Sequence, residues 1–339
     1  MSAAPGAEGP GKSDDTGVRI KSTRRTIENA LFGVLYTLTK EKLAKKNWFA
    51  FFLVAVDYLQ LVAFVMTSAF DWRVDPTVQD VFNEIMSYFS FIQLQNLLES
   101  FGYFAYIGGL TVLSMILLFS VIVSFFIAYF FKTNSFPFVW PIKIARVFIS
   151  IFFGSFYISS LQIFLIALDC FTIGQDVPYL ESFPDIHCWE FPNIMLVIIS
   201  VIMISVFFLA SLLLTLVMFD PSPDTKELLG TPDARAETRM FFVKTILTII
   251  AVVVSSYGQV QAVTILVAGC LLTYYVLYYF PFYSKKMNVA RIGLYSSIAY
   301  IGACSCYLTF RARTDEDKTA ITTALLIGLV PSVIVGGLI

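Results

Sequence analysis

The sequence predicts an all-α integral membrane protein with about eight transmembrane helices, and three observations lead to this prediction. Hydrophobic residues make up 58% of the 339 residues and charged residues only 14%, whereas a soluble domain carries about 25% charged residues. The apolar residues form runs long enough to cross the hydrocarbon layer, for which a helix needs about 20 residues. Lys and Arg gather at alternate ends of these runs, as the positive-inside rule requires.

The residues before the first apolar run divide into two parts. Residues 1–25 are rich in Gly, Ser and charged residues, so they are expected to form a disordered cytoplasmic tail. Apolar residues at helical spacing predict an amphipathic interfacial helix over 26–46. Four lysines in this stretch are expected to attract anionic lipids of the inner leaflet; they are Lys40, Lys42, Lys45 and Lys46. A cytoplasmic helix packed against the bundle is the alternative.

Eight apolar runs are predicted to span the membrane. They are 48–70, 103–131, 147–168, 193–219, 240–257, 260–283, 292–310 and 319–339. The fifth and sixth runs are almost contiguous, which predicts a tight helical hairpin between them.

Residues 78–99 have helical periodicity but carry several amides and two glutamates, Glu84 and Glu99. We interpret this stretch as an outer interfacial helix and not as a ninth span. With eight spans and a cytoplasmic N-terminus, the cytoplasmic segments hold 18 Lys and Arg and the outer segments hold 4. A ninth span would move Lys132, Lys143 and Arg146 outside, against the positive-inside rule. The expected location is the plasma membrane.

Two cysteines, Cys170 and Cys188, share the predicted outer loop 169–192, which holds five acidic residues and no Lys or Arg. Cysteines in an oxidising compartment typically pair, so a disulfide is predicted. Closing a ring of this length stabilises the fold by ~3 kcal/mol. Two free thiols near the interface are the alternative.

The polar residues inside the predicted spans are the candidates for function. Asp57 lies near the middle of the first span, with Gln60 one turn further on the same face. A carboxylate at that depth costs at least ~2.5–3.5 kcal/mol, so it is expected to face the bundle or water. Lys244 is a candidate partner, although it could also extend to the headgroups. Gln162 is a further polar candidate, and packing alone is the other explanation for Asp57.

One face of the last predicted span lacks bulky side chains. Its small residues recur every four positions and are Ala320, Ala324, Gly328, Ser332 and Gly336. Small residues let helices approach closely, so this is expected to be a helix-packing face. Pro331 lies on the same helix, which makes a gating hinge the alternative.

Motifs for catalysis and cofactor binding are absent from the sequence. It contains no phosphate-binding loop, zinc-protease motif or nucleotide fingerprint, and one His with five Cys at non-zinc spacing predicts no metal site. We therefore expect no enzyme, no cofactor and no nucleic-acid partner. A homo-oligomer in the lipid bilayer is compatible with the sequence.

Residues 30–64 read ALFGVLYTLTKEKLAKKNWFAFFLVAVDYLQLVAF. The amphipathic stretch that ends in Lys40-Glu41-Lys42, then Trp48, then Asp57-Tyr58-Leu59-Gln60-Leu61 resembles the N-terminal membrane region of the tiny macrocysts protein B and C family. In that family this region precedes large cytoplasmic parts with helical repeats and often PAS sensor domains. The resemblance implies a similar continuation after Ile339 and transfers no catalytic residue.

Three functions follow from these observations. The first is a membrane input or anchor module of a larger sensory or signalling protein, which the resemblance implies. The second is an ion channel or transporter in which Asp57, Gln162 and Lys244 line a path. The third is a structural membrane scaffold.

Overall fold

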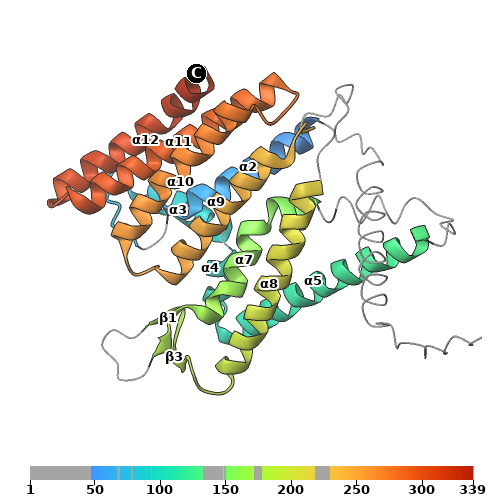
Figure 1. Ribbon diagram of the computed structural model, residues 1–339. Coiled ribbons are helices and arrows are strands. Elements are labelled where there is room, and N and C mark those ends of the chain that lie inside the picture. The colour runs from blue at the N-terminus through green and yellow to red at the C-terminus, as the bar shows by residue number, and fades with distance from the viewer. Residues whose placement is uncertain are drawn as a thin grey trace, which may run out of the picture.

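The computed structural model describes residues 47–338, apart from 67–68, 78, 93, 133–147, 149, 172–177 and 218–229. The tail 1–25, the interfacial helix predicted over 26–46 and its four lysines lie outside the described residues. Helices make up most of the described chain, and a small three-stranded sheet caps one end of the helical bundle (Figure 1).

Five of the described helices are long and apolar enough to cross a membrane. They are α5 (Tyr103–Lys132), α8 (Asn193–Val217), α10 (Gly258–Tyr279), α11 (Lys285–Phe310) and α12 (Asp315–Leu338). Each overlaps one predicted span. The count of eight is not confirmed, because the other three predicted spans form shorter or more polar helices.

The predicted span 48–70 is too long. Its helix, α2 (Asn47–Ala63), has 17 residues, about 26 Å at 1.5 Å per residue. The chain then folds back, and the Trp72 Nε1 donates a hydrogen bond to the Val65 carbonyl at 2.9 Å. Val65 and Trp72 are both buried. The apolar residues after Ala63 therefore belong to the protein core and not to a longer helix.

The predicted span 147–168 is broken into three pieces. These are the π-helix η1 (Ser150–Ser155), α7 (Tyr157–Leu165) and the 3-10 helix η2 (Ile166–Leu168). All nine residues of α7 are buried. This helix packs against protein on every side, which a hydropathy pattern does not distinguish from contact with lipid.

The predicted span 240–257 begins too late. Its helix, α9 (Ala234–Val253), starts directly after Asp233, whose Oδ1 accepts a hydrogen bond from the Arg235 backbone N–H at 2.9 Å. This N-cap satisfies a backbone donor that the first turn leaves free. The helix therefore includes charged residues that the sequence pattern placed in a loop.

The stretch 78–99 is helical, as predicted, but divided into α3 (Gln79–Ile92) and α4 (Leu94–Ser100). Beside α4 lies the antiparallel sheet of β1 (Cys170–Phe171), β2 (Tyr179–Leu180) and β3 (Phe183–His187), in the order β1-β2-β3. Cys170 and Cys188 form a disulfide, with their Cα atoms 6.0 Å apart. The predicted disulfide is thus present.

Contacts distinguish two ends of the bundle. At the sheet end, Ser182 Oγ donates to Glu99 Oε1 at 2.6 Å, and Lys318 Nζ lies 2.6 Å from Asp71 Oδ2. The sheet end thus gathers α4, the sheet, the segment after α2 and the α11–α12 turn. At the opposite end, the Tyr283 N–H donates to the Gly230 carbonyl at 3.1 Å. That contact brings the chain before α9 to the α10–α11 turn.

Two glycines let α10 and α11 approach very closely. A Cβ on Gly269 would lie 2.5 Å from the Ala299 nitrogen, and a Cβ on Gly302 would lie 2.6 Å from the Leu266 Cα. Helices in membranes associate through such small residues because backbone contact replaces the missing hydrophobic driving force.

The small-residue face of α12 packs against α11 over part of its length. The Tyr300 hydroxyl donates to the Ala324 carbonyl at 2.6 Å, and Ser296 Oγ donates to the Ser332 carbonyl at 3.0 Å. A Cβ on Gly328 or on Gly336 would overlap these two side chains. Ala320 and Ala324 are both exposed, and within the described chain only Ala324 of these two has a hydrogen bond to α11, through its carbonyl. The α12 helix continues through Pro331.

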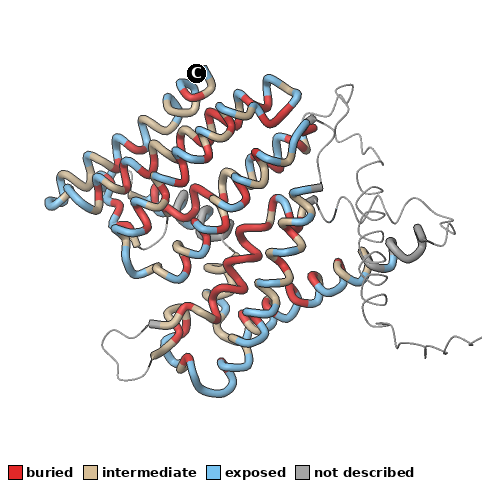
Figure 2. The backbone as a smooth tube through the Cα atoms, in the orientation of Figure 1, coloured by how far each residue is buried: buried red, intermediate tan, exposed pale blue. Residues whose placement is uncertain are grey.

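Exposed residues follow the outer helices (Figure 2), and many of them carry large apolar side chains. On α5 and α8 they include Phe104, Met115, Phe119, Ile198, Ile202 and Leu209, and on α12 Ile327, Val330 and Ile334. An apolar surface of this extent is unfavourable in water. It fits insertion into a lipid bilayer, because contact with acyl chains removes the unfavourable free energy of exposing apolar side chains to water.

Candidate functional site

A buried ion pair joins α2 to α9. Lys244 Nζ donates to Asp57 Oδ1 at 2.6 Å and to Oδ2 at 2.7 Å. The two side chains are 11% and 13% exposed. A charge-assisted contact with both oxygens offsets part of the cost of removing these charges from water.

The helix α11 extends this ion pair into a network. The Tyr295 hydroxyl donates to Asp57 Oδ2 at 3.1 Å, and Arg291 Nε donates to the same hydroxyl at 3.1 Å. Arg291 also forms an ion pair with Glu237 on α9, with a second contact from Nη2 to Oε2 at 3.3 Å. Asp57, Lys244, Tyr295, Arg291 and Glu237, which we call the charge network, thus connect three helices.

The four charged residues of the network line a cavity of about 250 Å³. Its other walls come from η1, α7, α8 and Phe282, which follows α10. Because Thr231 and Phe282 belong to the opposite end of the bundle, this opposite-end cavity reaches from that end to the depth of Asp57. The network is therefore in contact with space that water can fill.

A second cavity, of about 520 Å³, lies at the sheet end. Its lining is mostly polar and includes Glu99 of α4, Asp169, Glu181, and Gln162 of α7. Burial, followed by the nearby charges of Glu181 and Glu99, raises the pKa of Asp169 to about 8. An ionised carboxylate is disfavoured where solvent is scarce and like charges are close.

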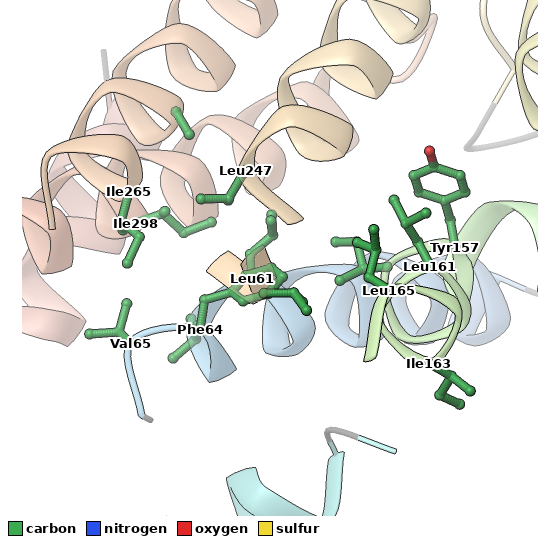
Figure 3. Close-up of a cluster of buried hydrophobic side chains, with 14 of the residues drawn as sticks. Leu61, Phe64, Val65, Tyr157, Leu161, Ile163, Leu165, Leu247, Ile265 and Ile298 are labelled. Atoms are coloured by element: carbon green, nitrogen blue, oxygen red, sulfur yellow. The ribbon is translucent and has the colours of Figure 1, made fainter. Parts of the chain in front are cut away.

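The two cavities lie along the same interface, formed by α7, α9 and the chain of α2 with Phe64 directly after it. On α9, Lys244 lines the first cavity and Ala251 the second, with Leu247 between them. Seven helical residues correspond to about 10 Å. Leu61, Leu161 and Leu247, one from each helix, are at most 1% exposed and pack in the same core cluster (Figure 3). We call these three leucines the leucine layer; in each of the three segments the leucine lies between a residue that lines the first cavity and a residue that lines the second.

The predicted polar candidates are divided between these places. Asp57 and Lys244 are in contact, whereas Gln162 lines the other cavity. A single path lined by all three is thus not what the structure shows, because the leucine layer intervenes. Gln60 is 3% exposed, and its Oε1 has no hydrogen-bond partner among the described residues.

The sequence pattern missed the α11 part of the network. It placed Arg291 in a cytoplasmic loop, but α11 begins at Lys285 and Arg291 lies on its second turn. Arg291 and Tyr295 are four residues apart. A helix predicted to begin before Arg291 would therefore have placed both side chains on the same face. Glu237 was missed for the same reason, because α9 starts before the apolar run.

The charge network pairs acidic with basic side chains across α2, α9 and α11. Within the described ranges, no group of three or more His, Cys, Asp or Glu is placed to hold a metal ion. The network can fix the relative positions of α2, α9 and α11, and it can respond to a change in its hydration.

The five long apolar helices and the apolar residues exposed on them fit a helical protein inserted in a membrane. The chain is 23% identical over 308 residues to Tiny macrocysts protein C of Dictyostelium discoideum, which covers 90% of this chain and 21% of that protein. Its similarity to Tiny macrocysts protein B of the same organism is also 23% over 308 residues, with 89% and 21% covered. The chain is therefore similar to these two proteins over most of its own length, as the resemblance of residues 30–64 predicted.

The chain spans about a fifth of the length of these curated relatives. No family model matches the chain. No solved structure matches it either.

Proposed function

We propose that this chain is the membrane input module of a larger sensory or signalling protein. The observation that supports the proposal most is the coverage of its relatives: nearly the whole chain aligns with only about a fifth of each. In those proteins the homologous part is therefore one module among others. An input module needs a part that receives a stimulus and helices that carry a displacement across the membrane.

The charge network favours the input module and argues against an open transport path. Its four charges pair with one another, Asp57 with Lys244 and Glu237 with Arg291. The leucine layer leaves no polar group of the network in contact with the sheet-end cavity. The network therefore links α2, α9 and α11. A displacement of α2 or α9 at the sheet end would also displace the linked helices at the opposite end.

We further propose an eight-span arrangement, with α2, α7 and α9 crossing the bilayer as well. The N-terminus and the opposite end would face the cytoplasm and the sheet end the outside. The division of Lys and Arg, 18 against 4, supports this orientation. In this orientation, Lys40 and its neighbouring lysines would meet anionic lipids of the plasma membrane. A homo-oligomer fits the same arrangement.

A replacement experiment tests the input function. In the intact protein in its own cells, residues 47–338 are exchanged for an unrelated membrane anchor with the same number of crossings. We expect the cellular response to be lost at an unchanged surface level. An unchanged response would reduce the segment to an anchor or scaffold and contradict the input function.

A transporter or channel is the second candidate, favoured by one observation. The two cavities face opposite ends of the bundle along the same three-helix interface, with about 10 Å of packed side chains between them. Alternating access needs such a barrier. Purified protein in liposomes is tested for flux of Na⁺, K⁺ and protons. No flux in the wild type, with flux in Leu161→Ser, supports a closed module, whereas saturable flux in the wild type supports the transporter.

A further inference from the structure

The sheet-end cavity carries negative charge without a basic counterpart. Glu99, Asp169 and Glu181 line it from α4, from the segment after η2 and from the β2–β3 turn. No Lys, Arg or His is among the described residues that line it. A concave site of one charge sign, enclosed by protein, concentrates ions of the other sign.

The hydrogen bonds that these carboxylates accept come from neutral donors. Glu99 Oε1 accepts from Gln95 Nε2 at 2.9 Å and from Ser182 Oγ at 2.6 Å. Glu181 accepts from Ser255 and, at 3.3 Å, from Ser256. These donors fix the positions of the carboxylates but leave their charges uncompensated, which favours a bound cation.

A buried amide points to a ligand independently of the acidic residues. Gln162 is 4% exposed and lines the cavity, and its side-chain amide has no hydrogen-bond partner in the described part of the chain. An amide that faces a cavity without a protein partner is available to a polar ligand or to bound water. Asp169, 5% exposed, reaches the same space.

The size of the cavity and its geometry select the class of ligand. Cavities of about 300–1,000 Å³ hold small organic molecules, and this one measures about 520 Å³. The described residues offer no arrangement of acidic side chains that would coordinate a metal ion directly. An organic cation that can also donate hydrogen bonds meets both requirements.

We propose that the sheet-end cavity binds a small organic solute that carries a primary ammonium group. The ammonium would contact Glu181 and Asp169, and the Gln162 amide would bind a polar group on the remainder of the solute. This assignment goes beyond the input function and holds for a transporter as well, because it concerns binding alone.

Calorimetry on the purified protein in nanodiscs of neutral lipid tests the site, with putrescine as the probe. We expect saturable binding that Glu181→Gln weakens at least about tenfold, since one charge-assisted hydrogen bond is worth that much. Gln162→Leu should also weaken it. Asp185→Asn, an exposed carboxylate on β3 that does not line the cavity, is the matched control and should bind as the wild type does.

The pH dependence provides an independent readout. Asp169 faces Glu99 from α4 and Glu181 from the β2–β3 turn, and the described lining from α2, α9 and α10 adds no titratable group. Its pKa of about 8 makes it mostly neutral at pH 7. Asp169 becomes ionised between pH 7 and pH 9. The ratio of the putrescine affinity of the wild type to that of Asp169→Asn, measured at the same pH, should therefore rise over this range.

Three results would overturn the proposal. They are the absence of saturable putrescine binding, equal binding by wild type and the cavity variants, and calcium binding that depends on Glu181 and resists putrescine. Intact folding is checked by gel filtration and by the Cys170–Cys188 bond. If Glu181→Gln does not fold, Glu99→Gln takes its place; it removes a negative charge from the cavity lining and should also weaken binding. Failure of putrescine binding leaves the replacement experiment on the input function unaffected.

Discussion

The ammonium group of Lys244 contacts both carboxylate oxygens of Asp57, at 2.6 Å and 2.7 Å, and so joins α9 to α2 across 187 positions of sequence. Tyr295 holds one of the same oxygens from α11. Asp57 is therefore a buried group with three polar contacts and not an isolated carboxyl in lipid. This arrangement lowers the cost of a charge in the membrane by pairing it and by giving it hydrogen bonds.

The disulfide at the sheet end gives the first prediction. Cys170→Ser should lower the free energy of unfolding by ~3 kcal/mol, because the unfolded chain regains the freedom of an open loop. The measurement is chemical denaturation in detergent. Cys306→Ser, which removes a free cysteine, is the control and should have a small effect. Recovery of both loop cysteines as free thiols in unreduced peptide maps would refute the bond.

The contact between α10 and α11 gives the second prediction. Gly302→Ala would place a Cβ 2.6 Å from the Leu266 Cα, so the two helices must separate. We expect a loss of about 1–3 kcal/mol, as for other overpacked sites, seen as a lower midpoint of thermal unfolding. Gly108→Ala is the control, because a Cβ there meets no atom within 4 Å. Equal midpoints for the two variants would refute the close approach.

The buried carboxyl of Asp169 gives the third prediction. Its pKa is raised to about 8 in the folded state, from 3.8 when it is unperturbed. Between these values the folded state binds more protons than the unfolded state, so this group makes stability fall as pH rises. Thermal unfolding from pH 5 to pH 8 should show a steeper fall for the wild type than for Asp169→Asn. Parallel curves for the two proteins would exclude the raised pKa.

The orientation in the membrane gives the fourth prediction. In a variant without Cys270, Cys304 and Cys306, a cysteine at Thr314 should react with an impermeant thiol reagent on intact cells. A cysteine at Ser284 should react only after the cells are opened. The reason is that the α11–α12 turn lies at the sheet end and the α10–α11 turn at the opposite end. The reverse labelling pattern would invert the proposed topology.

The sequence predicted the parts of the fold that depend on long-range composition. Runs such as 103–131 and 193–219 became α5 and α8 almost unchanged, because a long apolar run in a helix has few alternatives. The run 147–168 did not, since α7 is apolar through burial in protein. Apolar pattern alone cannot separate a lipid-facing helix from a core helix.

Only part of the site was predicted, because the prediction relied on the apolar runs. Asp57 and Lys244 stand out because each interrupts an apolar run. Arg291 and Glu237 lie just outside such runs, where charge is normal, so only the lengths of α11 and α9 reveal that Arg291 is buried and pairs with Glu237. The sheet-end cavity joins residues from α4, α7 and the β2–β3 turn, and no local pattern could have brought these together.

The charge network within the three-helix interface is tested most directly by a double-mutant cycle on Asp57 and Lys244. Either Asp57→Asn or Lys244→Gln alone leaves the other charge buried, so we expect each to cost roughly 3–5 kcal/mol. The double variant should cost clearly less than the sum of the two. The same cycle on Asp71 and Lys318, an exposed pair, should give a coupling of at most about 1 kcal/mol. Additive effects of Asp57→Asn and Lys244→Gln would show that the two side chains do not meet and would contradict the charge network.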